Sequence, residues 1–408
     1  MTRSTLPTSN WACWRARTSR QNQRATNKHR HSATLDTGAP LSDDRQQEIE
    51  TDSGRYSQNA DEPNEAHHPP FDGALVRCRR TLKCAPRAPS LGAVQQMLSP
   101  WLNGRRVCDV QLLTGGLTNR NCRVRIDDAP GSIVLRLYDR DATACAKEVA
   151  VLELLRPTLP VPDVLYAEAA TRDGRPPFAV LQFVDGLSLR DLKLTRDLAA
   201  IGQASYDAGR VLARLQTHSF PRAGLLTPAL TVDSSLIAGP ITTTGLIALL
   251  AKSPAFGRRV EARILDRLLR VAEEWDKSPA APVMGPTLVH GDFNSRNVLV
   301  SEREGKWGVA AIVDWEFAFA GPVICDIGHF LRYERSARPR FEPFFSRGCR
   351  DGGMDLRGDW LMAARMADLP ALCELLARES TPDDVIGEVL GLLTATVDQR
   401  EGDDPDMV

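Results

Sequence analysis

Residues 107–183 combine short strand-like segments with one helical segment, and this order leaves few architectures open. Alternating apolar and polar residues predict strands at Val107–Leu113, Asn121–Ile126, Ile133–Tyr138, Val164–Ala169 and Phe178–Phe183. Helical spacing at Ala142–Leu155 separates the first three strands from the last two. Because short turns join successive strands, these strands are expected to pair antiparallel. The sequence therefore predicts a five-stranded antiparallel sheet with one inserted helix.

After Gly186 the periodicity is mainly helical. The clearest amphipathic segments are Ala204–Gln216 and Arg258–Trp275, and another, Leu91–Leu102, precedes the strands. Residues 381–384 (TPDD) supply an N-cap, a first-turn proline and acidic residues, which predict a final helix. The fold class is therefore predicted to be α+β, with a small N-lobe that contains the sheet and a larger, mostly helical C-lobe. The predicted segments are an N-terminal extension (1–89), the N-lobe (90–186), the helical C-lobe (187–400) and an acidic tail (401–408).

Residues 1–89 differ in composition from the rest of the chain. They are rich in Ser, Thr, Asn, Gln, Arg, Pro and Asp and have neither helical nor strand periodicity. We expect a disordered extension, or one that does not belong to the native protein because translation starts near Met97. No acidic residue precedes Asp36, whereas basic residues are frequent before it, so a transit peptide or a nucleic-acid-binding arm stays open as an alternative.

Charge and cysteine usage narrow the class of protein. The chain has 51 Lys and Arg against 52 Asp and Glu, which argues against binding of the whole chain to nucleic acid or to an anionic membrane. Its 9 cysteines are scattered, without a C-x-x-C pair or the spacing of a zinc site. No apolar run reaches the roughly 18 residues needed to cross a bilayer. We expect a reduced, soluble, cytoplasmic protein with no membrane partner, and the oligomeric state stays open.

The segment 288–300 (LVHGDFNSRNVLV) sets polar residues between two apolar runs. Phosphoryl transfer needs a carboxylate that orients an acceptor hydroxyl and takes its proton, and an amide oxygen that binds magnesium. Asp292 fits the first role and Asn297, five positions later, fits the second. A further apolar run ends at Asp314, where a carboxylate can bind a hard cation, so Asp314 is the main candidate ligand for Mg²⁺. His290 is predicted to be a structural hydrogen-bonding residue.

This ordered set of motifs closely resembles the aminoglycoside phosphotransferase family, whose pattern choline and homoserine kinases share. The set comprises H-G-D-x-x-x-x-N at 290–297, the run that ends at Asp314, FAFAGP at 317–322 and DIG at 326–328. The resemblance runs from about Leu112 to Arg332. It implies a two-lobed protein-kinase-like fold, ATP and Mg²⁺ as cofactors, and a small molecule with a hydroxyl group as the acceptor.

The resemblance also assigns N-lobe residues to the nucleotide. The turn after Leu113 is similar to the family's nucleotide-covering turn, where glycines let N–H groups approach phosphate oxygens. Arg136 stands where such kinases carry a phosphate-binding lysine, with Glu148 as its expected ion-pair partner. Leu181–Gly186 resembles the hinge that meets adenine. The implied nucleotide-binding residues are Gly115, Gly116, Thr118, Asn119, Arg136, Glu148, Gln182 and Val184.

Two features favour a small molecule over a protein as the acceptor. Gly291 occupies the position at which protein kinases carry an arginine, and the twelve positions from Asp314 to Asp326 leave no room for an activation loop. The acceptor is expected to be aminoglycoside-, choline- or homoserine-like. An arginine-rich stretch, 332–350, favours a carboxylate- or phosphate-bearing acceptor. A polycation is favoured instead by the acidic residues Glu374, Glu379, Asp383 and Asp384. The alternative function is a nucleotide-binding scaffold without transfer activity.

Overall fold

The computed structural model describes residues 87–113, 119–127, 131–139, 141–172, 174–233, 242–278, 284–335 and 337–402. The predicted N-terminal extension up to residue 86 and the end of the predicted acidic tail lie outside these ranges. Within them, no helix is both long enough and apolar enough to cross a membrane.

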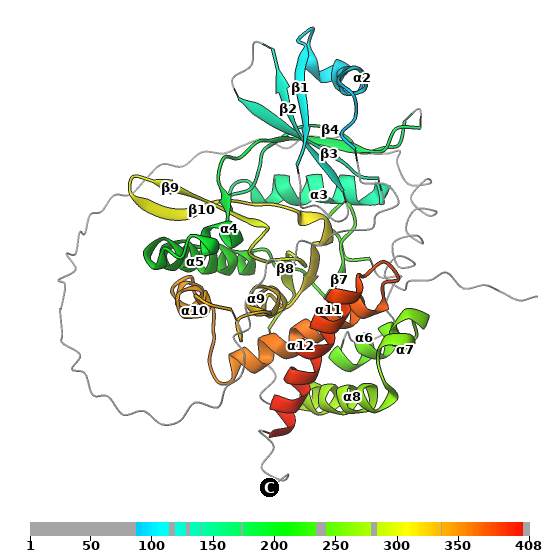
Figure 1. Cartoon of the computed structure of the whole chain (residues 1–408), viewed down its shortest axis with the longest axis vertical. Coiled ribbons are helices and arrows are strands. Elements are labelled where there is room, and N and C mark those ends of the chain that lie inside the picture. The colour runs from blue at the N-terminus through cyan, green and yellow to red at the C-terminus, as the bar shows by residue number, and fades with distance from the viewer. Residues whose placement is uncertain are drawn as a thin grey trace, which may run out of the picture. The chain divides into compact units, whose positions relative to one another are not determined.

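A five-stranded sheet forms the N-terminal part of the described chain (Figure 1). In spatial order its strands are β1 (Val107–Leu112), β2 (Arg120–Ile126), β3 (Ser132–Leu137), β5 (Phe178–Gln182) and β4 (Val164–Glu168). Every neighbouring pair runs antiparallel. Helix α3 (Ala142–Leu155) joins β3 to β4. The predicted antiparallel sheet with an inserted helix is confirmed.

Alternation along β3 sends successive side chains to opposite faces of this sheet. Leu135 is fully buried in an apolar cluster between the sheet and helix α2 (Leu91–Leu102). Arg136 points to the other face, where α3 supplies Glu148. Because β3 is paired on both sides, to β2 and to β5, the backbone of Arg136 is held at the centre of the sheet.

Helices make up most of the chain after Gly186 (Figure 1). They are α4 (Leu189–Leu194), α5 (Leu198–Ala213), α6 (Thr243–Leu250), α7 (Pro254–Arg259), α8 (Ala262–Lys277), α9 (Ile324–Leu331), α10 (Glu342–Asp351), α11 (Trp360–Ala377) and α12 (Asp383–Gly402), with 3₁₀ turns η2 (Arg214–Thr217) and η3 (Trp315–Phe317). One small sheet has the order β10 (Lys306–Ile312), β9 (Val298–Arg303), β6 (Leu187–Ser188). The other has the order β7 (Gly224–Leu225), β11 (Phe319–Gly321), β8 (Thr287–Val289). The loop from β8 to β9 carries Asp292 and Asn297, and Asp314 lies just after β10.

Two predicted helices differ from those observed. The segment Ala204–Gln216 is part of a longer helix that starts at Leu198 and ends in the 3₁₀ turn η2. The segment Arg258–Trp275 is divided into α7 and α8. Val260 between them is extended, with φ −113° and ψ 119°, and its side chain packs in the core. A β-branched residue favours this conformation, so burial of Val260 outweighs a continuous helix.

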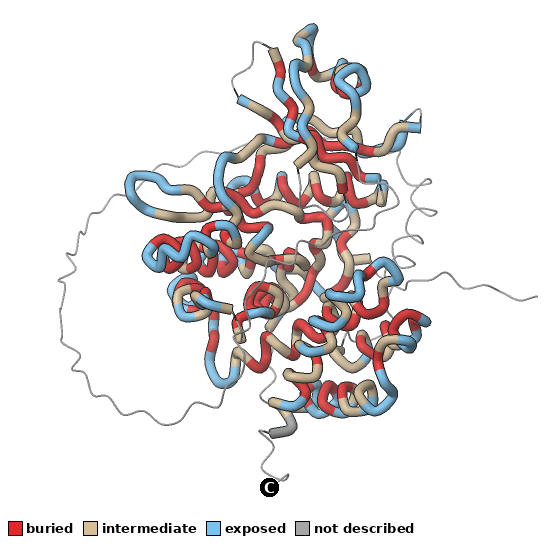
Figure 2. The backbone as a smooth tube through the Cα atoms, in the orientation of Figure 1, coloured by how far each residue is buried: buried red, intermediate tan, exposed pale blue. Residues whose placement is uncertain are grey.

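Helices α5 and α10 approach each other so closely that glycines are required at their contact. Figure 2 shows many buried residues along α5. A Cβ atom on Gly209 of α5 would lie 2.1 Å from the carbonyl oxygen of Phe345. One on Gly348 of α10 would lie 1.9 Å from the carbonyl oxygen of Tyr206. Both distances are far below van der Waals contact, and the obstructing atoms are backbone atoms, which cannot rotate away.

Replacement of Gly348 by alanine is therefore expected to separate α5 from α10 and to lower the free energy of unfolding by about 1–3 kcal/mol. Urea denaturation of the purified variant measures this loss. Gly257→Ala is the matched control, because a Cβ at Gly257 of α7 meets nothing within 4 Å. Alanine at this exposed helical position should leave stability unchanged or raise it by up to about 1 kcal/mol. Equal stability of the two variants would contradict the close contact.

Candidate active site

A cavity of about 710 Å³ opens between the five-stranded sheet and the loops that flank the β9–β10 hairpin. Its lining includes six of the residues predicted from the sequence: Arg136, Glu148, Gln182, Val184, Asn297 and Asp314. These residues come from β3, α3, the end of β5 and the segment after it, and the two ends of the hairpin. Tertiary structure thus brings together positions that are up to 178 residues apart in the chain.

Asp292 lies in the loop between β8 and β9, where two amide side chains hold its carboxylate. Asn294 donates from Nδ2 to Oδ1 at 2.8 Å, and Asn297 donates from Nδ2 to Oδ2 at 3.0 Å. The same Asn297 nitrogen also donates to the backbone oxygen of Asp292 at 2.9 Å. Each carboxylate oxygen keeps further lone pairs that can accept a hydroxyl proton. The two amides therefore orient the Asp292 carboxylate and still leave it able to accept another hydrogen bond.

The surroundings of Asp292 also set its affinity for protons. Burial raises the pKa of Asp292 to about 6, and the negative charge of Asp314 contributes in the same direction. The amides of Asn294 and Asn297 and the positive Arg332 oppose this shift. A carboxylate with such a pKa is ionised at neutral pH, and it is a stronger base than an exposed aspartate.

Asp326 at the start of α9 fixes the backbone that leads into Asp292. Its buried carboxylate accepts the N–H of His290 at 2.7 Å and the N–H of Gly291 at 3.0 Å. Gly291 has φ +79°, and a Cβ there would lie 2.5 Å from the carbonyl oxygen of Phe317. Glycine is therefore required at position 291 both by backbone conformation and by space.

His290 has the structural role that was predicted from its position in the motif. Its Nε2 lies 3.0 Å from the carbonyl oxygen of Val313, and its Nδ1 accepts the N–H of Asp292 at 3.2 Å. These two contacts require a neutral ring with the proton on Nε2. Burial lowers the pKa of His290 to about 4, which keeps the ring neutral. Through this ring the Asp292 loop is joined to the residue just before Asp314.

Asp314 has a left-handed backbone conformation, with φ 69° and ψ 53°, directly after β10. This conformation is uncommon for residues other than glycine and reverses the chain at the end of the strand. The carboxylate is partly exposed, with 27% of the side chain accessible, and forms an ion pair with Nη1 of Arg136. Since Asp314 and Asn297 line the same cavity, two oxygen-bearing side chains are available there for a hard cation.

Arg136 is buried at the centre of a cluster of acidic side chains. Its Nε donates to Oε2 of Glu148 at 2.9 Å, and Nη2 lies 3.6 Å from Oε1 of Glu316. Burial lowers the pKa of Arg136, but Glu148, Asp314 and Glu316 outweigh this effect and raise it well above its ordinary value. Among the described residues, Nη2 has no hydrogen-bond partner. This nitrogen is fully buried, and the Glu316 carboxylate beside it compensates its positive charge.

Glu148 links this cluster to the loop that carries Asp314. Its Oε1 accepts the N–H of Trp315 at 3.1 Å, and Oε2 also accepts the hydroxyl proton of Tyr138 at 2.8 Å. Burial raises the pKa of Glu148, and the positive charge of Arg136 counteracts this rise. The predicted pair of Arg136 and Glu148 is thus present, and it extends to the residue after Asp314.

Of the other residues predicted to contact the nucleotide, only some are described by the structure, and only two of these line the cavity. Gly115, Gly116 and Thr118 lie outside the described residues. Asn119 is buried, and its Nδ2 donates to Oε2 of Glu316 at 2.9 Å rather than facing the cavity. In the hinge segment, Gln182 and Val184 line the cavity.

Sequence reasoning gave no role to Asn294, Asp326 or Glu316. Asn294 could have been recognised as an Asx-type residue two positions after Asp292, which commonly bonds to nearby polar groups. Asp326 was noted as part of a motif, but its contact with residues 290 and 291 depends on how α9 packs. Glu316 meets Arg136 and Asn119 from distant parts of the chain, so no local signal indicates it.

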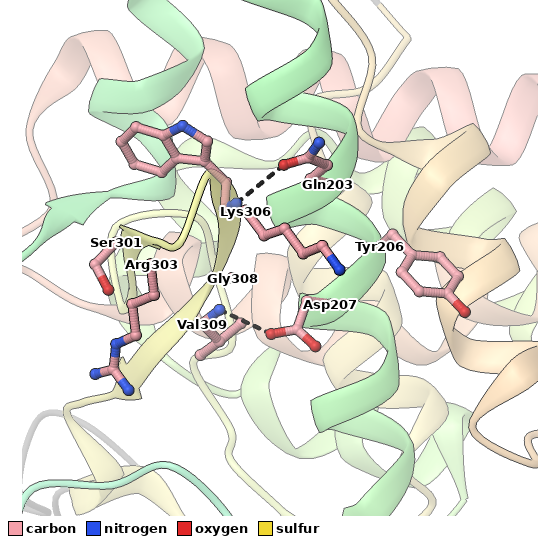
Figure 3. A pocket seen from close by; sticks show the side chains of 9 residues that line it. Gln203, Tyr206, Asp207, Ser301, Arg303, Lys306, Gly308 and Val309 are labelled. Atoms are coloured by element: carbon pink, nitrogen blue, oxygen red, sulfur yellow. Dashed lines mark hydrogen bonds between the residues drawn. The ribbon is translucent and has the colours of Figure 1, made fainter. Parts of the chain in front are cut away.

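A second cavity, of about 490 Å³, lies on the α5 side of the β9–β10 hairpin and contains none of the predicted residues (Figure 3). There Gln203 accepts the N–H of Trp307 at 2.9 Å, and Asp207 accepts the N–H of Val309 at 2.8 Å (Figure 3). These bonds satisfy the free edge of β10. Helix α5 thereby anchors the hairpin whose ends carry Asn297 and Asp314.

The buried Asp326 predicts a specific dependence of stability on pH. Burial raises its pKa from an ordinary 3.8 to about 7, although the N–H groups of His290 and Gly291 lower it. Stability from a raised carboxyl pKa is fully present below about pH 4 and is lost as the pH rises through about 7. The free energy of unfolding of the wild type, relative to Asp326→Asn, should therefore decrease over this interval. Urea denaturation at a series of pH values tests this.

As a control, the exposed change Asp185→Asn should leave the dependence of the unfolding free energy on pH as it is in the wild type. Parallel curves for the wild type and Asp326→Asn would refute the assignment.

Comparison with known proteins identifies the family and the fold of this chain. The profile of the phosphotransferase enzyme family matches residues 109–369. A stretch of 45 residues is 51% identical to methylthioribose kinase of Bacillus pumilus (strain SAFR-032), but it spans only 11% of this chain and 10% of that kinase. Aminoglycoside 2′-phosphotransferase-IIIa in complex with GDP has a TM-score of 0.57 at 16% identity, over 76% of this chain and 99% of that chain.

A thermostable mutant of aminoglycoside phosphotransferase APH(4)-Ia, in ternary complex with AMP-PNP and hygromycin B, has a TM-score of 0.54 at 19% identity. The match covers 75% of this chain and 98% of that chain. These likenesses confirm the expected two-lobed protein-kinase-like fold. Because the family profile covers more than half of the sequence, the chain belongs to the phosphotransferase enzyme family, and the predicted assignment to the small-molecule kinases is confirmed.

Proposed function

We propose that this protein transfers the γ-phosphate of ATP, with Mg²⁺, to a hydroxyl group of a small molecule. The observation that carries the proposal is the arrangement of Asp292, Asn297 and Asp314 next to one cavity that also reaches the hinge. Phosphoryl transfer depends mainly on positioning and on compensation of negative charge, and these residues supply both.

Asp292 acts as the base in the proposed reaction. Its carboxylate is oriented by Asn294 and Asn297, and its raised pKa makes it a better acceptor for the proton of the substrate hydroxyl. Holding that hydroxyl in line with the phosphorus atom lowers the entropic part of the barrier. The proton moves to the carboxylate as the new oxygen–phosphorus bond forms and the bond to ADP breaks.

Asn297 and Asp314 are the residues that would hold magnesium. Because Nδ2 of Asn297 donates to Asp292, its amide oxygen is the atom left for a cation. The Asp314 carboxylate adds a charged oxygen at the rim of the same cavity. Mg²⁺ is usually bound by one or two such groups together with phosphate oxygens and water, and when bound it compensates the charge of the phosphates.

The other predicted residues that line the cavity are assigned to ATP. Arg136 lines the cavity, and the positive charge of its guanidinium is suited to phosphate oxygens. Gln182 and Val184 supply hinge backbone for the adenine, and Gly115, Gly116, Thr118 and Asn119 stay proposals for the turn that covers the phosphates. Structurally similar proteins were crystallised with AMP-PNP and with ADP.

The contacts of the charged residues weaken one argument for a polycationic acceptor such as an aminoglycoside. Glu379 is paired with Arg258, and Glu374 with Arg378. Asp383 and Asp384 lie in the first turn of α12. Within the basic stretch, Arg332 forms two bonds to Asp368, at 2.7 and 2.6 Å. Much of the charge at both places is thus used internally, so neither stretch by itself selects the acceptor.

The scaffold alternative predicts nucleotide binding without transfer. It is disfavoured because the Asp292 carboxylate, which nucleotide binding alone does not need, is held by two amides and a buried loop. An acceptor screen that follows ADP production distinguishes the two functions.

Replacement of Asp292 by alanine should lower turnover by roughly 10²–10⁴ because the base is removed. ADP release with the best acceptor of the screen measures the effect. Binding of AMP-PNP should change little, since the hinge and Arg136 are intact. Full activity of Asp292→Ala would disprove the role of this residue.

Magnesium dependence provides a separate test of Asp314. Asp314→Asn keeps the size of the side chain but removes its charge, so the magnesium concentration for half-maximal activity should rise on the order of tenfold or more, as for loss of a charged contact. Titration of activity with MgCl₂ at fixed ATP measures this. Asp266→Asn, an exposed change on α8, should leave the titration unchanged, and an unshifted curve for Asp314→Asn would argue against metal binding by this residue.

A further inference from the structure

Two arginines stand at the mouth of the large cavity and are used by none of the roles given above. Arg190 is in the first turn of α4, and Arg296 immediately precedes Asn297. Both line the cavity, together with Ser188 and Asp191. They lie on the side of the cavity where the hinge segment passes into α4, away from the buried cluster around Arg136 on β3.

A backbone contact brings these arginines together. The N–H of Arg190 donates to the carbonyl oxygen of Ser295 at 2.9 Å, which ties the start of α4 to the loop that carries Asp292. The two guanidinium groups lie close enough for their positive charges to repel. Arg190 is half-buried and Arg296 is exposed, so an anion from solvent can reach both, and their combined positive charge attracts it.

Within the described residues, no side chain compensates this charge by an ion pair with either arginine. Asp191 is the nearest candidate in sequence, but its carboxylate accepts the hydroxyl of Ser188 at 2.7 Å as part of the helix cap. The positive charges of Arg332 and Arg296 act on Glu388 of α12, but the described residues show no ion pair of Glu388 with either arginine. The arginine pair therefore remains available to an anion from outside the chain.

Arg296 is also within electrostatic reach of Asp292. An anion held at the arginine pair would therefore be close to the proposed base, whereas the phosphates of ATP are assigned to Arg136 and to the Mg²⁺ that Asn297 and Asp314 would hold. Arginine is well suited to this task because its planar fork of donors matches a carboxylate or a phosphate.

We propose that the acceptor carries a negatively charged group, a carboxylate or a phosphate, and that Arg190 and Arg296 bind this group while the acceptor's hydroxyl meets Asp292. The proposal rests on the transfer function given above and narrows its substrate class to hydroxy acids and phosphorylated alcohols. A purely cationic acceptor is disfavoured, because the two arginines would repel it.

Binding of matched compounds that differ in one charge tests the proposal independently of turnover. D-Glycerate and glycerol 3-phosphate are compared with glycerol, and gluconate with glucose, by calorimetric titration into the protein saturated with magnesium and AMP-PNP. The wild type should bind at least one anionic member roughly 10- to 100-fold more tightly than its neutral counterpart, the range for hydrogen bonds to a charged group. The double variant Arg190→Gln/Arg296→Gln should lose this preference.

The control variant is Arg303→Gln, which removes an exposed arginine of β9 that lines the other cavity (Figure 3). It should keep the preference for anions, and Arg190→Lys/Arg296→Lys should keep part of it. An equal anion-to-neutral ratio in the wild type and the glutamine double variant, or no preference in the wild type, would overturn the proposal. So would a comparable loss of AMP-PNP affinity in the double variant, since the arginines would then serve the nucleotide.

ADP release is measured separately with the same compounds. A wild type that binds anionic members selectively but releases no ADP would contradict the proposed transfer function and leave the anion site in place. A wild type that phosphorylates neutral members as well as anionic ones would contradict the anion site and leave the transfer function in place.

Discussion

The buried guanidinium of Arg136 joins the two parts of this protein. It is carried by the central strand of the N-terminal sheet and meets Glu148 of α3, Asp314 after β10, and Glu316 in η3. A charge buried to this degree must be compensated by partners, and loss of one partner from a buried ion pair costs several kcal/mol. The same contacts that stabilise the sheet therefore also determine where the loop that carries Asp314 lies.

A second set of contacts holds the loop that contains the proposed base. Asp326 accepts two consecutive N–H groups, His290 contacts Val313, and Gly291 lets the loop pass close to Phe317. These are backbone contacts, so they fix the path of the chain rather than the identity of a substrate. Helix α5 adds to this rigidity from the other side of the β9–β10 hairpin through Gln203 and Asp207.

The catalytic and acceptor sides of the cavity are built from different parts of the molecule. Asp292, Asn297 and Asp314 are local to one hairpin and its flanking loops, whereas the arginine pair needs α4 to be packed against residue 295. In the function proposed above, the acceptor is selected beside this hairpin by the positive charges of Arg190 and Arg296, which line the same cavity.

Much of the fold was predictable because it follows local periodicity. The five strands and α3 were expected from alternation and helical spacing, whereas the helix predicted over Arg258–Trp275 was divided, because burial of Val260 depends on neighbours that the local pattern does not contain. Asp292, Asn297 and Asp314 were identifiable because their spacing reflects the chemistry of one hairpin. Gly115, Gly116 and Thr118 lie outside the described residues, so their proposed role rests on sequence alone.

By itself, the sequence determined the order of strands and helices, the polar residues at the ends of apolar runs, and the resemblance to a kinase family. Only the tertiary structure decided that Arg136 is surrounded by three carboxylates, that Asp326 supports residues 290 and 291, and that Arg190 stands beside Arg296. The reason is physical: hydrophobic periodicity and turn chemistry act over a few residues, whereas burial, ion pairing and pKa depend on groups brought together from distant parts of the chain.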